Sequence, residues 1–249
     1  REKRFVRESF GRYLSPTLVE RLSENPAGLT LGGEDRELTI LFSDIRGFTS
    51  LSETMTPTEL TGLLNNFLTP MTDVLLKREA TIDKYIGDAI MAFWNAPLDI
   101  ADHPRKACLA ALDMVAALDR LNRESGMKLK IGIGLNTGMA CVGNLGSDQR
   151  FSYSCLGDSV NLASRVEGMT KLYEVSILVT EEVRAGTTGL LFAEVDRVRV
   201  VGRQAPVTLH VLIGVRDAMS SDLADLLHAH AAFIGAWQSG DLGTARNLL

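Results

Sequence analysis

The chain has 249 residues, of which 45% are hydrophobic, enough to bury the core of one main domain of about 150 to 200 residues with appendages. Lys and Arg number 26 against 31 Asp and Glu, and the resulting net charge of -5 argues against nucleic acid or an anionic membrane as the main partner. The three cysteines, Cys108, Cys141 and Cys155, include no C-x-x-C pair, so they indicate neither a disulfide framework nor a zinc site and favour a reducing compartment.

The first part of the chain is predicted to be helical and to precede the main domain. Residues 5–22 have the pattern of an amphipathic helix interrupted at Ser15 and Pro16, and breakers at 25–28 and 32–33 then predict a linker. No apolar run approaches the roughly 20 residues that a bilayer-spanning helix needs, and the first residues are neither a Met start nor a signal peptide. We therefore expect a cytoplasmic portion of a longer protein.

A strand and then a helix are predicted next. Residues 37–42 are rich in apolar and β-forming side chains, which favours a largely buried strand that ends at Asp44. The sequence T-P-T-E at 56–59 has the spacing of a capping box, with proline at the first helical position. This predicts a helix through residue 76, kinked at Pro70.

Two aspartates mark the ends of predicted strands. Residues 82–86 and 89–94 have the pattern of a hairpin around the two-residue loop Gly87-Asp88, which places Asp88 at the tip. A single aspartate at a turn is common for local reasons, because its side chain bonds nearby backbone N–H groups. The pair of Asp44 and Asp88 is more specific, since Mg²⁺ prefers one or two carboxylates with water and phosphate oxygens. The pair therefore indicates a metal site suited to phosphoryl transfer.

The rest of the chain alternates helices with strands. A helix is predicted over 102–123, another over 157–165 after a turn, and further helical pieces after residue 217, divided at 240–242. The glycine-rich stretch 143–146 lacks the Lys-Ser/Thr of a P-loop and is predicted to be a turn. The remaining strands are predicted over residues 129–135, 140–142, 151–156, 177–179, 190–195, 198–200 and 208–213. This order indicates an α/β sandwich and excludes an all-helical fold.

Four motifs follow one another along the chain. They are F-S-D-I-R-G-F-T at 42–49, D-K-Y-I-G-D-A-I-M-A-F-W at 83–94, I-G-I-G-L-N-T-G at 131–138 and L-G-D-S-V-N-L-A-S-R at 156–165. In this order and spacing the chain resembles, over residues 38–215, the catalytic domain of class III nucleotidyl cyclases, and among them the bacterial adenylate cyclases. The resemblance implies a ferredoxin-like α+β fold whose central, mostly antiparallel sheet is flanked by helices. It also implies three parts, a helical linker at 1–35, a catalytic domain at 36–216 and a C-terminal helical tail at 217–249.

The same resemblance implies a site for metal and triphosphate. Two ions per active site, Mg²⁺ or Mn²⁺, would be held by Asp44, Ile45 and Asp88. Cyclisation needs both ions, because the ribose 3′-oxygen attacks the α-phosphorus while pyrophosphate leaves, so one ion acidifies the hydroxyl and the other neutralises the leaving phosphates. The turn that lies against the triphosphate would consist of Gly47, Phe48 and Thr49.

Asn161 and Arg165 correspond to catalytic residues of the family. They are four residues apart, so they share one face of a helix. The planar, always charged guanidinium of Arg165 suits the negative charge that develops on the α-phosphoryl group, and the neutral amide of Asn161 can orient the ribose. Taken singly, a surface arginine and a helix-cap asparagine are the simpler interpretations; the motif favours catalysis.

Base selection departs from the commonest family pattern. The adenine-selecting pair is Lys with Asp; Lys84 occupies the first position, whereas Ser154 stands where Asp is usual. Because the hydroxyl can accept from the adenine amino group and Lys84 can donate to a ring nitrogen, ATP remains the better substrate. Cys155 is one residue away from the position of a guanine-selecting cysteine and is interpreted as a small apolar strand residue. Met139 stands where some relatives carry a phosphate-contacting Arg, and Arg203 is an alternative source of that charge.

The resemblance thus implies a homodimeric adenylate cyclase that makes cyclic AMP and pyrophosphate from ATP. The rival interpretations are a guanylate cyclase and a catalytically silent nucleotide-binding dimerisation module. Because a bicarbonate-responsive subset of the family carries Thr at the position of Ser154, bicarbonate is a hypothetical effector. The helical start could couple an upstream sensor domain, in a larger membrane-associated protein, to the geometry of the dimer, or it could simply pack.

Overall fold

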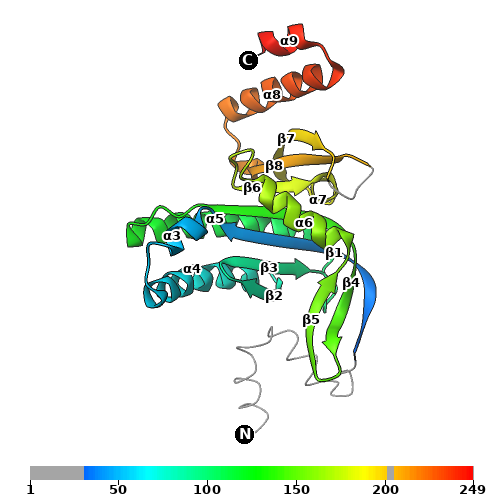
Figure 1. The fold of residues 1–249 in the computed structure, drawn as a ribbon. Coiled ribbons are helices and arrows are strands. Elements are labelled where there is room, and N and C mark those ends of the chain that lie inside the picture. Colours follow the sequence, from blue (N-terminus) through cyan, green and yellow to red (C-terminus); the bar gives the residue numbers. More distant parts are fainter. Residues whose placement is uncertain (1–30, 201–204, 249) are drawn as a thin grey trace.

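The computed structural model describes residues 31–200 and 205–248 (Figure 1). The predicted helix over 5–22 and the candidate Arg203 therefore lie outside the described residues. The strands are β1 (Gly32–Ile45), β2 (Thr81–Ile86), β3 (Ala89–Trp94), β4 (Ile131–Ser147), β5 (Arg150–Leu156), β6 (Ile177–Thr180), β7 (Leu190–Val198) and β8 (Val207–Val215). The helices are α3 (Phe48–Ser52), α4 (Pro57–Lys77), α5 (His103–Ser125), α6 (Asp158–Met169), α7 (Glu181–Ala185), the 3-10 helix η2 (Arg216–Ala218), α8 (Ser221–Ser239) and α9 (Leu242–Asn247).

The strands form one mixed, eight-stranded sheet in the order β2-β3-β1-β4-β6-β8-β7, and β5 pairs with β4 outside this path. Among the strand pairs of the described residues, β4 with β6 is parallel and the others are antiparallel. The prediction of an α+β fold with a mostly antiparallel central sheet is therefore confirmed.

Two strand predictions were wrong because glycines were interpreted as breakers. β4 is a single strand through the expected turn at 143–146, and β1 begins at Gly32. The two strands pair here, and a Cβ on Gly143 would lie 2.2 Å from the carbonyl oxygen of Gly32. These glycines therefore permit close backbone approach within the ladder. β7 is likewise one strand where two were predicted, with an irregular register between Glu194 and Asp196.

The helix α4 begins as predicted. The Thr56 hydroxyl accepts from the backbone N–H of Glu59 at 3.3 Å, and the Glu59 carboxylate accepts from the backbone N–H of Thr56 at 2.8 Å. Such a capping box satisfies two N–H groups that the first turn leaves without helical partners. The helix continues through Pro70 to Lys77, and its buried side chains are Leu63, Phe67, Met71 and Leu75.

The two faces of the sheet carry different clusters. Side chains alternate along β1, so Leu41 and Ile45 point into the core that α4 and α5 cover, whereas Leu38 and Ile40 point into a second cluster. That second cluster includes residues of β5 and α6, and the β4–β5 hairpin projects from the body of the sheet (Figure 1). Asp44 follows the alternation of Leu38 and Ile40 and therefore belongs to the second face.

The helix α6 rests with its backbone directly on β4 at Gly134. A Cβ there would lie 2.1 Å from the backbone nitrogen of Glu167 and 2.7 Å from the carbonyl oxygen of Ala163. We expect Gly134→Ala to lower the free energy of unfolding by at least about 2 kcal/mol, because two backbones must separate. Denaturant unfolding measures this, with Gly62→Ala as the control.

Gly62 lies inside α4 and an added Cβ meets nothing within 4 Å, so Gly62→Ala should stabilise the protein by about 0.5 to 1 kcal/mol. Similar effects of the two substitutions would show that the contact between α6 and β4 tolerates a methyl group.

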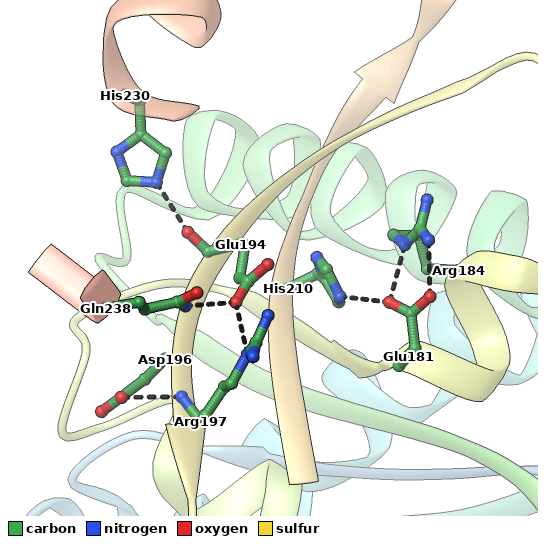
Figure 2. A network of polar contacts seen from close by, with 8 residues as sticks. All are labelled: Glu181, Arg184, Glu194, Asp196, Arg197, His210, His230 and Gln238. Atoms are coloured by element: carbon green, nitrogen blue, oxygen red, sulfur yellow. Dashed lines mark hydrogen bonds and ion pairs between the residues drawn. The ribbon is translucent and has the colours of Figure 1, made fainter. Parts of the chain in front are cut away.

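The C-terminal helices α8 and α9 extend beyond β7 (Figure 1). Figure 2 shows how α8 is held: His230 Nε2 bonds the carbonyl oxygen of Glu194 at 2.6 Å, and Gln238 Nε2 donates to the Glu194 carboxylate at 2.5 Å. The predicted break between the two helices is confirmed, since Gly240 adopts a left-handed conformation after α8. No helix in the described ranges is long and apolar enough to cross a membrane.

Candidate active site

Asp44 and Asp88 share one polar site. Asp44 lies near the end of β1, and Asp88 lies in the β2–β3 turn, where Gly87 has a φ of +66°. The backbone N–H of Ile45 donates to Asp88 Oδ2 at 3.0 Å. Burial, followed by the hydrogen bond and the negative charge of Asp44, raises the pKa of Asp88 to about 7. The two carboxyl groups thus resist carrying two negative charges together.

A divalent cation would relieve that repulsion, and the donor atoms fit one. Carboxylate and backbone carbonyl oxygens are the ligands that Mg²⁺ accepts, and Asp44, Ile45 and Asp88 carry such oxygens. Over residues 31–200 and 205–248, no group of three or more His, Cys, Asp or Glu side chains could hold a metal ion. A metal here would therefore complete its shell with water or with phosphate oxygens of a ligand.

The predicted triphosphate turn follows β1 directly. Gly47 adopts the left-handed conformation with φ 72° and precedes α3, which begins at Phe48. The Phe48 side chain packs against the core beneath α4 and α5, whereas Thr49 is exposed. Phe48 can therefore contribute little more than its backbone to a ligand, and Thr49 can contribute its hydroxyl.

Lys84 and Ser154 meet although they come from β2 and β5. Lys84 Nζ lies 3.5 Å from Ser154 Oγ, and Ser154 is buried. Both contact Asp83, which is not among the predicted site residues. The Asp83 carboxylate accepts from the Ser154 hydroxyl at 2.5 Å and lies 3.2 Å from Lys84 Nζ. The sequence signal for it was a pair of adjacent charges that breaks the alternation of a strand. Cys155, beside them, is buried in the second cluster, which confirms its interpretation as an apolar strand residue.

Asn161 and Arg165 lie exposed on α6. The helix buries its other side, namely Ser159, Val160, Leu162, Ala163 and Val166. The side chains at 161 and 165 therefore lie at the surface and not in the core of their own domain. Met139 is also exposed.

Arg46 and Glu167 are site neighbours that the motifs did not reveal. The Arg46 guanidinium donates to the carbonyl oxygens of Thr170, at 2.9 Å, and Val175, just beyond the end of α6. Burial and the negative charge of Asp44 raise the pKa of Glu167 to about 7, while Arg46 acts in the opposite direction. The turn after Asp44 is thereby fastened to the C-terminal end of α6.

Comparisons with known proteins agree on one family. Residues 33–214 match the family model described as the adenylate and guanylate cyclase catalytic domain. An adenylate cyclase of Anabaena cylindrica is 40% identical over 190 residues, which cover 73% of this chain and 36% of that protein. Adenylate cyclase 1 of Rhizobium meliloti is 33% identical over 218 residues, covering 86% of this chain and 33% of its own length. The chain spans about a third of the length of these curated relatives.

Solved structures agree with the fold. The adenylyl cyclase CyaB from P. aeruginosa superposes with a TM-score of 0.69 at 34% identity, covering 76% of this chain and 100% of that one. The guanylyl cyclase Cya2 superposes with a TM-score of 0.70, also at 34% identity, covering 76% of this chain and 98% of that one. Overall similarity therefore does not separate the two base preferences, and the residues at the base position must decide.

Proposed function

The chain belongs to the family of adenylate and guanylate cyclase catalytic domains, and from this premise we propose that it converts ATP to 3′,5′-cyclic AMP and pyrophosphate at composite sites of a homodimer. The observation that carries the proposal is the pairing of Asp44 and Asp88, where burial, followed by the hydrogen bond and the negative charge of Asp44, raises the pKa of Asp88 to about 7. A pair of this kind has little structural purpose and is suited to divalent metal.

Asp44, Asp88 and the Ile45 carbonyl would hold two Mg²⁺ or Mn²⁺ ions, which supply acidification of the 3′-hydroxyl and neutralisation of the leaving phosphates. The Ile45 N–H fixes the orientation of Asp88 by donating to Oδ2, so that Oδ1 remains to bind. The left-handed Gly47 turns the backbone sharply after the metal ligands, and Thr49 presents its hydroxyl at the surface where the phosphates would lie.

The exposed pair on α6 would act on the sugar and the α-phosphate. The guanidinium of Arg165 offers two parallel N–H donors to phosphoryl oxygens and stays charged throughout the reaction. The Asn161 amide, one helical turn earlier, can bond the ribose and hold the 3′-oxygen in line with the phosphorus. These two side chains therefore bind and orient, while no side chain here needs to form a covalent intermediate.

A homodimer is proposed because polar groups of the candidate site and large apolar side chains are exposed together. Lys84, Asn161 and Arg165 are all exposed, as are the large apolar side chains of Ile86 and Leu156, at 54% and 61%. An isologous contact would cover these apolar side chains and bring the base and α6 groups of one protomer to the carboxylate pair of the other. A second copy of this chain is thus the partner we propose.

The base preference can be tested by exchanging the pair that would read adenine. Lys84→Glu combined with Ser154→Cys should lower kcat/KM for ATP by roughly 10²-fold or more, because base-edge hydrogen bonds are lost while the phosphate contacts remain. GTP need not become a good substrate. Steady-state rates with each nucleotide measure the ratio, and an unchanged preference for ATP would place selectivity elsewhere.

The direct experiment is an assay of the purified domain with ATP or GTP and with Mg²⁺ or Mn²⁺, read by product identity. Formation of cyclic GMP alone would favour the guanylate cyclase alternative, and turnover of neither nucleotide would favour the silent module. Adding bicarbonate to the same assay tests the effector that the serine at 154 suggests. An upstream sensor domain in the longer protein is proposed as well.

A further inference from the structure

We propose that Asp83 is a positioning residue that sets the base preference of the proposed active site by fixing which hydrogen-bonding groups Ser154 and Lys84 present to the base. The inference rests on the proposed function, because it concerns the same pocket. It starts from three side chains, Asp83, Lys84 and Ser154, which contact one another in pairs.

The Asp83 side chain is a buried carboxylate at an irregular point of a strand. Its exposed fraction is 0%, and the register of β2 against β3 shifts between Ile82 and Lys84, so Asp83 is the extra residue of a β-bulge. Bulges re-aim side chains and often lie next to active sites. A carboxylate buried in this way is costly unless its partners compensate for lost water. The partners of Asp83 are therefore the evidence for its role.

One carboxylate oxygen binds Ser154 and the other faces Lys84. The Ser154 hydroxyl donates to Asp83 Oδ2 at 2.5 Å, and Lys84 Nζ lies 3.2 Å from Asp83 Oδ1. Oδ1 is otherwise a buried atom without a hydrogen bond among the described residues. The carboxylate thus orients the Ser154 hydroxyl hydrogen through Oδ2 and the Lys84 ammonium group through Oδ1.

This arrangement decides whether the Ser154 hydroxyl donates or accepts a hydrogen bond at the base. A hydroxyl has one hydrogen to donate and two lone pairs that accept, whereas an ionised carboxylate only accepts. Because the Ser154 hydrogen is given to Asp83, its oxygen can offer only lone pairs to the base. The exocyclic amino group of adenine is a donor and satisfies them, whereas the carbonyl of guanine is an acceptor and does not.

Lys84 completes the discrimination. Its ammonium group only donates, and the ring nitrogen beside the adenine amino group accepts, whereas the corresponding guanine nitrogen carries a hydrogen. Asp83 holds this ammonium beside Ser154, at 3.5 Å from Oγ. Ser154 replaces the Asp that the family usually has at this position. Asp83 compensates for this replacement, because its carboxylate takes the Ser154 hydrogen and leaves the hydroxyl oxygen as an acceptor for the base.

The test is Asp83→Asn, measured as the ratio of kcat/KM for ATP to that for GTP. The amide NH₂ can donate to Ser154 Oγ and so free the hydroxyl hydrogen for the base. We expect the ratio to fall by roughly 10-fold or more, mainly through a higher KM for ATP. The matched control is Asp196→Asn, because Asp196 also accepts a hydroxyl hydrogen, from Tyr173 at 2.7 Å, on the distant strand β7. The control should leave the ratio unchanged.

Two further variants separate positioning from simple support of the fold. In a Ser154→Ala background, Asp83→Asn should change the ratio less than it does in the wild-type background, because the hydroxyl that it orients is gone and only its contact with Lys84 is left to lose. Ser154→Asp added to Asp83→Asn should restore the preference for ATP, because the acceptor then faces the base directly. This double variant also decides the question if Asp83→Asn alone melts below the assay temperature. Equal losses with ATP and GTP, accompanied by a lower melting temperature, would overturn the proposal.

Binding of 3′-deoxy-ATP and 3′-deoxy-GTP, which cannot cyclise, distinguishes this inference from the proposed function. If wild-type protein forms no cyclic nucleotide, the proposed function fails, yet the two affinities and their change in Asp83→Asn still support or overturn the role of Asp83. If wild-type protein favours ATP and Asp83→Asn keeps the full preference in both assays, the inference alone is wrong.

Discussion

Asp44→Ala and Asp88→Asn should each abolish nucleotide cyclisation. Both substitutions remove a ligand shared by the ions that would acidify the 3′-hydroxyl and neutralise pyrophosphate, and such ions supply several kcal/mol of transition-state stabilisation. The expected loss in kcat is on the order of 10²-fold or more. The measurement is the initial rate of cyclic AMP formation at saturating ATP and Mn²⁺.

Folding should survive both changes, because the two carboxyl groups repel each other in the metal-free protein. Mn²⁺ should raise the melting temperature of the wild type and leave that of the variants unchanged, since only the wild type binds the metal well. Asp113→Asn serves as the control: Asp113 pairs with Arg78 at 2.7 Å, outside the candidate site. Near-normal turnover in Asp44→Ala or Asp88→Asn at saturating metal would remove the metal assignment.

Mixing two inactive variants should restore activity if the active sites are shared between chains. Asp44→Ala and Arg165→Ala homodimers should both be inactive, since one lacks a metal ligand and the other the positive charge for the α-phosphate. With free exchange, half of the dimers become heterodimers that hold one intact site of two, so activity should recover to roughly a quarter of wild type.

Subunit exchange must be shown independently, for example by native mass spectrometry of differently tagged chains. A mixture of Asp44→Ala with Asp88→Asn is the matched control, because both lesions fall in the same half-site and no intact site can form. Heterodimers that assemble yet stay inactive in the first mixture would contradict the shared site.

Local signals in the sequence were sufficient for most elements. The capping box at 56–59 predicts the start of α4 because its hydrogen bonds join residues three apart. The hairpin around Gly87 and Asp88 was equally predictable, since a two-residue loop fixes its own register. The candidate residues came from motifs, and Asp44 with Asp88, and Lys84 with Ser154, are the pairs that lie together.

Long-range packing could not be predicted in the same way. Glycines at 143–146 were interpreted as a turn because the sequence does not reveal that another backbone, at Gly32, approaches them. Asp83 carried no signal of its partner, since Ser154 is 71 positions away, on the separate strand β5. Arg46 was missed for the same reason, because its acceptors lie beyond the end of α6.

The helix α6 packs closely on Gly134, and Arg46 binds the carbonyl oxygens of Thr170 and Val175. This packing has a consequence for chimeric receptors built from this domain. These contacts join the turn after Asp44 to the helix that carries Arg165, so we expect an input to move the two little relative to each other within a protomer. In the proposed homodimer, we expect the input to rotate one protomer relative to the other. Each residue inserted into a fused helical connector rotates the attached domain by about 100°. We therefore expect cyclase activity to rise and fall with connector length, with the period of an α-helix, rather than to decrease steadily.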